Sequence, residues 1–423
     1  MLARTPPVGP ALGFELAGLE VGIAEYDEGP TGTTVFHFPS PVMAVIDVRG
    51  GAPGTVNTDT LRLAYDAPVL SALTFAGGSA FGLAVAAGVA DELKTRRPDP
   101  GHWRNIPIVV GGIIFDLGSR RFSTVTPDAE LGRAALRSAR DGWFPLGARG
   151  AGRFAMQGPY LGDAQYSGQG GAFGQVGPTR IAVFTVVNSS GAIVDRHGET
   201  VRPGGVSGGP IADRLAAKLK QLAAARSDDI AGAGLSANTT LTLLATNQKL
   251  PLWALQRVAV HVHTSMARAI QPFATETDGD MLCAVTTAEV DNPALSPRDL
   301  AVLGSEIAWD AVLASVPTLP AVERVSAPPT TGIDGLVGTY EFIPGKSAVV
   351  RRRDGSLTIE LGPHESLYLP AGQPVDLRPT AGSEFVLSTP RTDRVAFDLG
   401  ADGRARGLVI NPGPWAIPAR RVA

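Results

Sequence analysis

The chain has 423 residues, of which 44% are hydrophobic and 18% are charged, and its formal net charge is −3. This length is too great for one compact core, so we expect two domains. The lack of a basic excess argues against a nucleic-acid-binding surface. A lone cysteine, Cys283, cannot form an internal disulfide, so the fold does not depend on an oxidising compartment.

The apolar runs of the sequence are short. "IPIVVGGIIF" (106–115) and "GLAVAAGVA" (82–90) fall well below the ~20 residues that span a bilayer, so no association with a membrane is expected. The first residues lack the charged-then-apolar layout of a signal peptide. We therefore expect a cytoplasmic protein, and a secreted or periplasmic location stays open if an upstream segment has been removed.

The region before residue 317 mixes strand and helix patterns. Strands are predicted at residues 20–26, 31–39, 43–51, 106–117, 180–188 and 281–287. The continuous apolar runs at 106–117 and 180–188 are typical of strands buried on both faces. Between them and the early strands, residues 66–96 are rich in small residues and predict a helix.

Two amphipathic helices are predicted later in this region. The first begins at Pro251, and its apolar positions are spaced by three or four: Leu252, Leu255, Ala259, Val262, Met266 and Ile270. Pro272 ends this helix, and Ser296-Pro297 caps the next one. Buried strands flanked by amphipathic helices predict a layered α/β sandwich.

The domain boundary is predicted from a change in composition. Residues 317–332 are proline-rich without periodicity, which is typical of a linker. After it, the runs "SAVVRRR", "LTIEL", "SLYL", "EFVLS", "RVAFDL" and "GLVI" alternate with turn signals. Such short, closely spaced runs predict a small antiparallel barrel or sandwich over residues 333–423, appended to a larger domain over residues 1–316.

Nucleotide and metal motifs are weak in this sequence. "AGGSAFGLAVAAG" lacks the Gly-Lys-Ser/Thr ending of a phosphate loop, so close helix packing by small residues is the favoured interpretation. His261 and His263 lie two apart on a predicted helix, hence on different faces, with no carboxylate at i+4. The sequence has no Gly-x-Ser-x-Gly elbow. We expect neither a cofactor nor a metal ion.

Polar residues in two places of the sequence are typical of a reactive site. Asp278 and Asp280 precede a buried strand, and on an extended backbone both carboxylates project to one side. Like charges this close raise one pKa, which suits proton handling, and an ordinary Asp-Gly turn is the alternative. Asn188 ends an apolar strand, where its amide could donate to an oxyanion or begin a turn.

The stretch "AGAGLSANTTLTLLAT" places a flexible segment directly before a strand that begins with two threonines. A hydroxyl nucleophile needs a base, and cutting the chain before a threonine supplies an α-amine, which titrates near ~8 against ~10.4 for lysine. The pliable segment would leave after the cut, and the strand would hold the new terminus. A loop that simply enters a strand is the alternative.

Residues 14 to about 315 resemble the self-cleaving aminopeptidase family, which includes L-aminopeptidase/D-esterases, β-peptidyl aminopeptidases and nylon (6-aminohexanoate-oligomer) hydrolases. The likeness is greatest to the nylon hydrolases. The matching stretches occur in order: "VGIAEYDEGPTGTTVFHFP", "AGGSAFGL", "GRAAL", "SGQGGAFG", "VVNSSGAIVDR", "ANTTLTLLATN" and "VHTSMARAIQPFATETDGDMLCAVTT".

This resemblance implies a fold and a site. The fold is a four-layer αββα sandwich of the N-terminal-nucleophile type, with the small β-domain outside the family core. Cleavage would fall between Asn238 and Thr239, making Thr239 the nucleophile and its freed amine the general base. Asn188 would assist at the oxyanion, and Asp278 and Asp280 would orient and tune the nucleophile. No metal or cofactor is implied, and the cleaved protomers would form a homo-oligomer, a tetramer in the related enzymes.

Two positions depart from the nylon-hydrolase pattern. Phe115 stands where those enzymes have a tyrosine, and Pro159 is the nearest counterpart of a lysine near their nucleophile. A cation beside Thr239 would stabilise the alkoxide and lower the pKa of the amine, so its loss could slow cleavage, slow turnover or shift the substrate.

The expected function is therefore that of an autoprocessing amide hydrolase acting on short peptides, β-peptides or 6-aminohexanoate oligomers through an acyl-enzyme. The two departures keep open a family member with weak activity that serves as a binding or assembly protein. An amine acyltransferase is the remaining alternative.

Overall fold

The computed structural model describes residues 1–5, 9–62, 68–118, 122–224, 238–318, 332–362, 372–380, 382–389 and 393–423. They form two compact units, each described below by itself. The first unit comprises Met1–Tyr26, Thr31–Asp116 and Thr126–Thr318, and the second Asp27–Pro30, Leu117–Val125 and Leu319–Ala423. Most of the predicted linker lies outside the described residues, as does the segment at 231–237 that the sequence predicts to be flexible.

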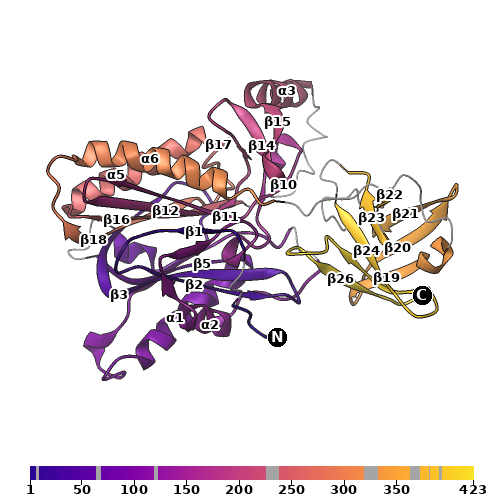
Figure 1. Ribbon diagram of the computed structural model, residues 1–423, viewed down its shortest axis with the longest axis horizontal. Coiled ribbons are helices and arrows are strands. Elements are labelled where there is room, and N and C mark those ends of the chain that lie inside the picture. The colour runs from indigo at the N-terminus through magenta and orange to yellow at the C-terminus, as the bar shows by residue number, and fades with distance from the viewer. Residues whose placement is uncertain are drawn as a thin grey trace. The chain divides into compact units, whose positions relative to one another are not determined.

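The first unit is built on a ten-stranded mixed sheet (Figure 1). Its strands are β2 (Glu20–Tyr26), β3 (Thr31–Val48), β4 (Thr55–Val56), β5 (Val69–Ala76), β6 (Val109–Ile113), β7 (Arg140–Asp141), β11 (Gln169–Val176), β12 (Thr179–Asn188), β16 (Thr239–Gln248) and β18 (Met281–Val290). The main order is β11-β12-β16-β18-β3-β5-β6-β4, with β2 attached to β3 and β7 attached to β2. The pairs β16–β18 and β5–β6 are parallel.

Helices cover the sheet in two groups. The helices are α1 (Ala84–Thr95), α2 (Ala129–Arg137), α3 (Ile211–Ala224), α5 (Leu252–Ser265) and α6 (Pro297–Ala314). Helix α5 packs on β3 and β18 and helix α6 on β11 and β12, whereas α1 packs on β5 and β6 and α2 on β2 and β3 (Figure 1). Leu244 on β16 faces α5 and α6, and its neighbours Leu241 and Leu243 face a second core with Phe36 and Phe184.

Short elements complete the first unit. Two-stranded pairs are β1 (Ala11–Gly13) with β8 (Trp143–Pro145), β9 (Met156–Gln157) with β10 (Gln165–Tyr166), β13 (Ala192–Ile193) with β17 (Ile270–Gln271), and β14 (Glu199–Arg202) with β15 (Val206–Pro210). Its 3-10 helices are η1 (Thr58–Leu61), η2 (Ser79–Leu83), η3 (Trp103–Asn105), η4 (Gly150–Gly152), η5 (Pro159–Leu161), η6 (Pro203–Gly205) and η7 (Met266–Arg268).

Most strand predictions are confirmed, with two corrections. The helix predicted for 66–96 is wrong in its first half, because Val69–Ala76 forms β5; pairing with both β3 and β6 overrides the helix preference of its Leu and Ala residues. The strands predicted at 31–39 and 43–51 are one strand, β3. Its pairing with β5 shifts between His37 and Val42, and that irregularity accommodates the intervening prolines.

The helix predicted to reach Ile270 ends earlier. Helix α5 stops at Ser265, and Ile270–Gln271 instead forms β17, which pairs with β13. The chain has to leave the helix before that pairing can form. The cap predicted for α6 is confirmed, since the Ser296 hydroxyl accepts the backbone N–H of Asp299 at 3.2 Å.

The second unit contains a closed eight-stranded barrel, which confirms the predicted small antiparallel β-domain. Its strands are β19 (Gly338–Ile343), β20 (Lys346–Arg353), β21 (Ser356–Leu361), β22 (Val375–Pro379), β23 (Glu384–Leu387), β24 (Arg394–Leu399), β25 (Ala405–Ile410) and β26 (Ile417–Arg421), preceded by the 3-10 helix η8 (Ile333–Leu336). The predicted strand "SLYL" lies outside the described residues. Closure pairs β19 with β26 and leaves neither as a free edge.

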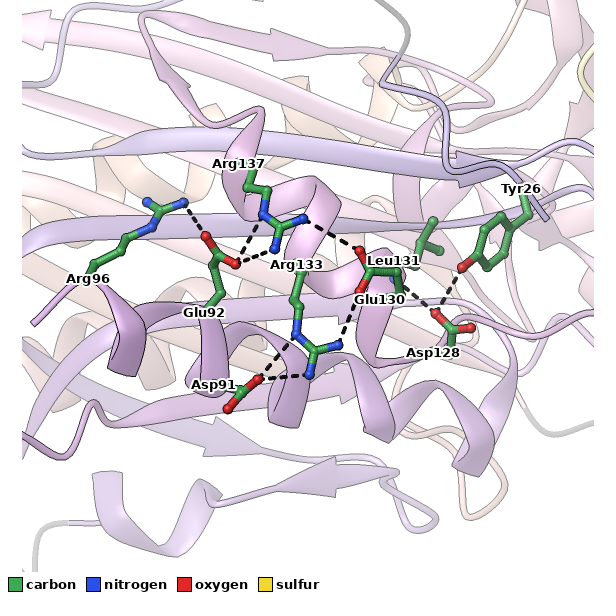
Figure 2. Close-up of polar contacts among 9 residues, drawn as sticks. All are labelled: Tyr26, Asp91, Glu92, Arg96, Asp128, Glu130, Leu131, Arg133 and Arg137. Carbon is green, nitrogen blue, oxygen red and sulfur yellow. Dashed lines mark hydrogen bonds and ion pairs between the residues drawn. The ribbon is translucent and has the colours of Figure 1, made fainter. Parts of the chain in front are cut away.

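Ion pairs join α1 to α2 on the surface of the first unit, as Figure 2 shows. Arg133 contacts Asp91 at 2.8 Å, and Arg137 contacts Glu92 at 2.8 Å. These pairs are largely exposed, so they contribute little to stability. Gly88 and Gly132 allow the backbones of the two helices to approach closely, because a Cβ on Gly88 would lie 2.0 Å from the Ala129 carbonyl oxygen.

Asp128 caps α2, and its removal is expected to destabilise the fold. Its carboxylate accepts the N–H of Leu131 and the hydroxyl of Tyr26, both at 2.9 Å (Figure 2). Asp128→Ala should lower the free energy of unfolding by about 1 kcal/mol, measured by urea denaturation. Asp91→Ala is the matched control, since it removes an exposed acid without a cap; equal losses in the two variants would contradict this role.

Candidate active site

Strand pairing brings the predicted site residues together from distant parts of the chain. Thr239 is the first residue of β16, and Asn188, the last residue of β12, lies directly opposite it in the antiparallel register. On the other side, Asn238 forms a parallel bridge with Asp278, just before β18 begins. Thr239 is buried, with 3% of its surface exposed. The interior position of β16 therefore fixes Thr239 between the asparagine and the two aspartates.

The carbonyl oxygen of Asn238 accepts two hydrogen bonds. The Thr239 hydroxyl donates to it at 2.5 Å, and the backbone N–H of Gly279 donates to it at 2.7 Å. A Cβ added to Gly279 would lie 2.6 Å from the Thr239 Oγ1, so a glycine is required there. The sequence analysis did not single out Gly279, although its place between the two aspartates could have indicated a role in the site.

Each predicted aspartate is held by backbone donors. Asp280 accepts the N–H of Thr240 on Oδ1 and the N–H of Ala274 on Oδ2, the latter at 2.9 Å. Asp278 accepts the N–H and the hydroxyl of Thr275 on Oδ2, at 2.9 and 2.7 Å. Burial, reinforced by the charge of Asp278, raises the pKa of Asp280 to about 7. Asp280 can therefore exchange a proton near neutral pH.

The loop that carries the aspartates rests on the chain that follows β3. Arg49 and Gly50 donate their N–H groups to the carbonyl of Asp280, at 3.0 and 3.2 Å, and Ala52 donates to that of Asp278 at 2.8 Å. A Cβ on Gly50 would lie 2.2 Å from the Asp278 carbonyl oxygen, so no side chain fits between the two backbones. The position of the two carboxylates is therefore determined by contacts between backbone segments.

Asn188 is oriented by two contacts. Its Oδ1 accepts the N–H of Met156 at 2.9 Å, and its Nδ2 donates to the carbonyl of Phe115 at 3.1 Å. An amide nitrogen carries two hydrogens, so the second can serve a substrate oxygen. Phe115 thus joins the site through its backbone. Pro159 begins η5, and the backbone N–H of the next residue, Tyr160, donates to the carbonyl of Ser190 at 3.1 Å. Ser190 follows Asn188 by two residues, so this bond ties η5 to the segment after β12.

The two histidines singled out by sequence have different environments. His261 is exposed, whereas His263 is fully buried on α5, and its Nδ1 lies 2.9 Å from Asp47 Oδ2. The described part of the chain contains no cluster of three or more histidine, cysteine or acidic side chains suited to a metal ion. Among the described helices, none is long and apolar enough to cross a membrane.

Comparison with known families identifies the first unit. The family model described as "Peptidase family S58" matches residues 14–323. The chain belongs to peptidase family S58. The match covers every site residue described above and ends before the barrel.

Individual S58-related proteins agree with this assignment. The 6-aminohexanoate-oligomer endohydrolase of Paenarthrobacter ureafaciens is 39% identical over 318 residues, which cover 71% of this chain and 85% of that protein. Among solved structures, a β-aminopeptidase from Burkholderia sp. aligns with a TM-score of 0.52 and 15% identity, over 73% of this chain and 88% of that one.

A third comparison identifies the fold type. The L-aminopeptidase D-Ala-esterase/amidase of Ochrobactrum anthropi, described as a variant of the Ntn-hydrolase fold, aligns with a TM-score of 0.51 and 16% identity, over 74% of this chain and 87% of that one. The S58 unit therefore has the Ntn-hydrolase fold. Family membership and relatives together make the chain an Ntn-type hydrolase that acts on amide bonds.

Proposed function

We propose that this S58 protein cuts its own chain between Asn238 and Thr239 and then hydrolyses linear amides with Thr239 as the nucleophile. The observation that carries the proposal is the Asn238 carbonyl oxygen, which is held by the Thr239 hydroxyl at 2.5 Å and by the Gly279 N–H at 2.7 Å. A hydroxyl is thus placed against the carbonyl group that it would attack, beside a donor that can stabilise the oxyanion.

The self-cleavage would proceed through an ester. Thr239 Oγ1 forms a bond to the carbonyl carbon of Asn238 as its proton passes to a base, and the bond from that carbon to the Thr239 nitrogen breaks as the nitrogen gains a proton. Water then hydrolyses the ester, which frees the carboxylate of Asn238 and the amine and hydroxyl of Thr239. Asp280, whose Oδ1 accepts the N–H of Thr240 next to the nucleophile and whose pKa is raised to about 7, is the group proposed to take the proton.

The same residues would act in turnover. The freed amine of Thr239 accepts the proton of its own hydroxyl, the acyl group of the substrate is transferred to Oγ1, and water releases the acid. Asn188 would donate to the oxyanion, and Asp278 and Asp280 would orient the amine. We propose 6-aminohexanoate oligomers, on which the Paenarthrobacter relative is named as acting, and short peptides as substrates.

We propose that the fold around this site is the four-layer αββα sandwich. The packing of α5 and α6 on one set of strands and of α1 and α2 on another supports this proposal. Cleaved protomers are proposed to assemble as homo-oligomers, with a tetramer as the first expectation.

The experiment that tests the proposal is the intact mass of the purified chain under denaturing conditions. Two species that correspond to residues 1–238 and 239–423, with threonine at the new amino terminus, are the expected result. A single 43.8 kDa species after long incubation at neutral pH would overturn it. Release of amino groups from 6-aminohexanoate oligomers and from short peptides would then rank the two substrate classes.

A further inference from the structure

A partly buried cluster of charged and polar side chains adjoins the backbone segment that holds the aspartate loop. Asp47, near the end of β3, accepts hydrogen bonds on Oδ2 from His263 Nδ1 at 2.9 Å and from Arg49 Nε at 2.6 Å. His263 is fully buried in the core between α5 and the sheet. The proposed reaction uses none of these three side chains, so their role has to be sought in the segments that they hold in place.

The protonation of this cluster follows from its partners. Burial opposes the charge of Asp47, but the hydrogen bonds and charges of His263 and Arg49 outweigh it and lower the pKa of Asp47. Burial lowers the pKa of His263, so its ring is neutral at neutral pH. Because a carboxylate can only accept, the single ring proton of neutral His263 is on Nδ1. The ring is thereby fixed in one orientation on α5.

The first connection from His263 to Asp280 runs through Asp47. The Arg49 guanidinium that shares Asp47 Oδ2 also donates from Nη2 to the Val260 carbonyl on α5, at 3.4 Å. The backbone N–H groups of Arg49 and Gly50 then donate to the Asp280 carbonyl. The end of β3 is therefore tied to α5 on one side and to the aspartate loop on the other.

The second connection runs through Phe273. Its ring packs edge-on against the His263 ring, with centroids 5.5 Å apart and an interplanar angle of 78°. The next residue, Ala274, has a φ of 54° and donates its N–H to Asp280 Oδ2 at 2.9 Å. A shift of the His263 ring would move Phe273, and with it the donor that holds the Asp280 carboxylate.

We propose that His263, through its hydrogen bond to Asp47, is a positioning residue for the proton-transfer carboxylate Asp280. This inference rests on the proposed function, because it assigns to Asp280 a part in self-cleavage and turnover. Two backbone segments meet at Asp280, one from Arg49-Gly50 and one from Phe273-Ala274, and His263 contacts the side chains that fix both. Loss of the Nδ1 donor would leave Asp47 held by Arg49 alone, and Asp280 would lose its set position relative to Thr239.

Two substitutions separate the hydrogen bond from the volume of the ring. The Nδ2 of asparagine lies close to the position of a histidine Nδ1, so His263→Asn retains a donor to Asp47. His263→Leu fills the same core but cannot donate, and it leaves Asp47 with one partner fewer. Val258→Ala is the matched control, since Val258 is buried on the same helix and in the same core with no connection to the aspartate loop.

The test uses the full chain, refolded as precursor, together with assays on the mature enzyme. Self-cleavage rates, kcat and KM are measured for the wild type and the three variants, and each is normalised to the folded fraction from circular dichroism. His263→Leu is expected to slow self-cleavage and kcat by about 10- to 100-fold with KM unchanged, as for lost partners of other active-site groups. His263→Asn should stay within about threefold of the wild type, and Val258→Ala should change stability without changing either rate.

The outcomes distinguish the inference from the function on which it rests. A wild type that cleaves itself while His263→Leu matches it in rate would overturn the positioning role and leave the proposed function standing. Equal losses in His263→Leu and His263→Asn would overturn it too, because the hydrogen bond would then not be what matters. A wild type that never cleaves would overturn the proposed function, and the inference with it.

Discussion

Thr239→Ala is expected to leave the chain as one 43.8 kDa species under conditions in which the wild type separates into residues 1–238 and 239–423. Alanine lacks the hydroxyl that lies against the Asn238 carbonyl, so no ester can form. The variant should also hydrolyse amides no faster than the solvent background, since it has neither the hydroxyl nor the freed amine. Intact mass and an amide-hydrolysis assay measure the two losses.

The chain offers a matched control in the adjacent threonine. Thr240 is equally buried, and its hydroxyl makes no hydrogen bond to the Asn238 carbonyl. Thr240→Ala keeps the attacking hydroxyl of Thr239 and should therefore still cleave to completion, and Thr239→Ser, which keeps a hydroxyl, should cleave more slowly but also to completion. Cleavage of Thr239→Ala at the same peptide bond would show that another group performs the attack.

The rate of self-cleavage is expected to rise about tenfold per pH unit below pH 7 and to level off above it, so that pH 5 and pH 8 differ by about 100-fold. The direction of this change follows from Asp280. Burial and the charge of Asp278 raise the pKa of its carboxyl group to about 7. Below that value the carboxyl is protonated and cannot accept the Thr239 proton; above it the carboxylate is ionised and can.

Precursor refolded at pH 5 and transferred to buffers between pH 5 and 9 provides the measurement, with intact mass followed over time. Asp280→Asn removes the titrating group and should abolish the rise while slowing cleavage at every pH. A midpoint near pH 4, the usual range of an aspartate, would contradict the raised pKa of Asp280. A midpoint near 7 that persists in Asp280→Asn would assign the titration to another group.

Local sequence patterns were sufficient to place the candidate site residues at strand ends. Asp278 and Asp280 were expected to share a side and to have one raised pKa, and the structure has Asp280 in that state. Asn188 and Thr239 were each recognisable as the boundary of an apolar strand, and the barrel strands followed from alternation and turn signals. In each case neighbours in sequence carry the signal.

What sequence reasoning missed depends on contacts between distant segments. The bond from Asn188 to the Phe115 carbonyl and that from His263 to Asp47 join residues far apart in the chain, and no local pattern encodes either. His263 was judged by its spacing from His261, which says nothing about a carboxylate on another strand. Strand β5 was predicted as helix for the same reason: its Leu and Ala residues favour a helix locally, whereas two partner strands decide its conformation.

The order of the strands determines whether the two polypeptides of the cleaved protein can separate and refold. Strands β16 and β18 follow the proposed cut, yet they lie between β12 on one side and β3 on the other, which both precede it. The two polypeptides would therefore be interleaved within one sheet, and neither could leave without breaking a full ladder of backbone hydrogen bonds. Once unfolded, they would have to find each other again in a second-order encounter. After cleavage, the native state would thus be one that the precursor reaches by folding as a single chain and that the two separated polypeptides can regain only by association.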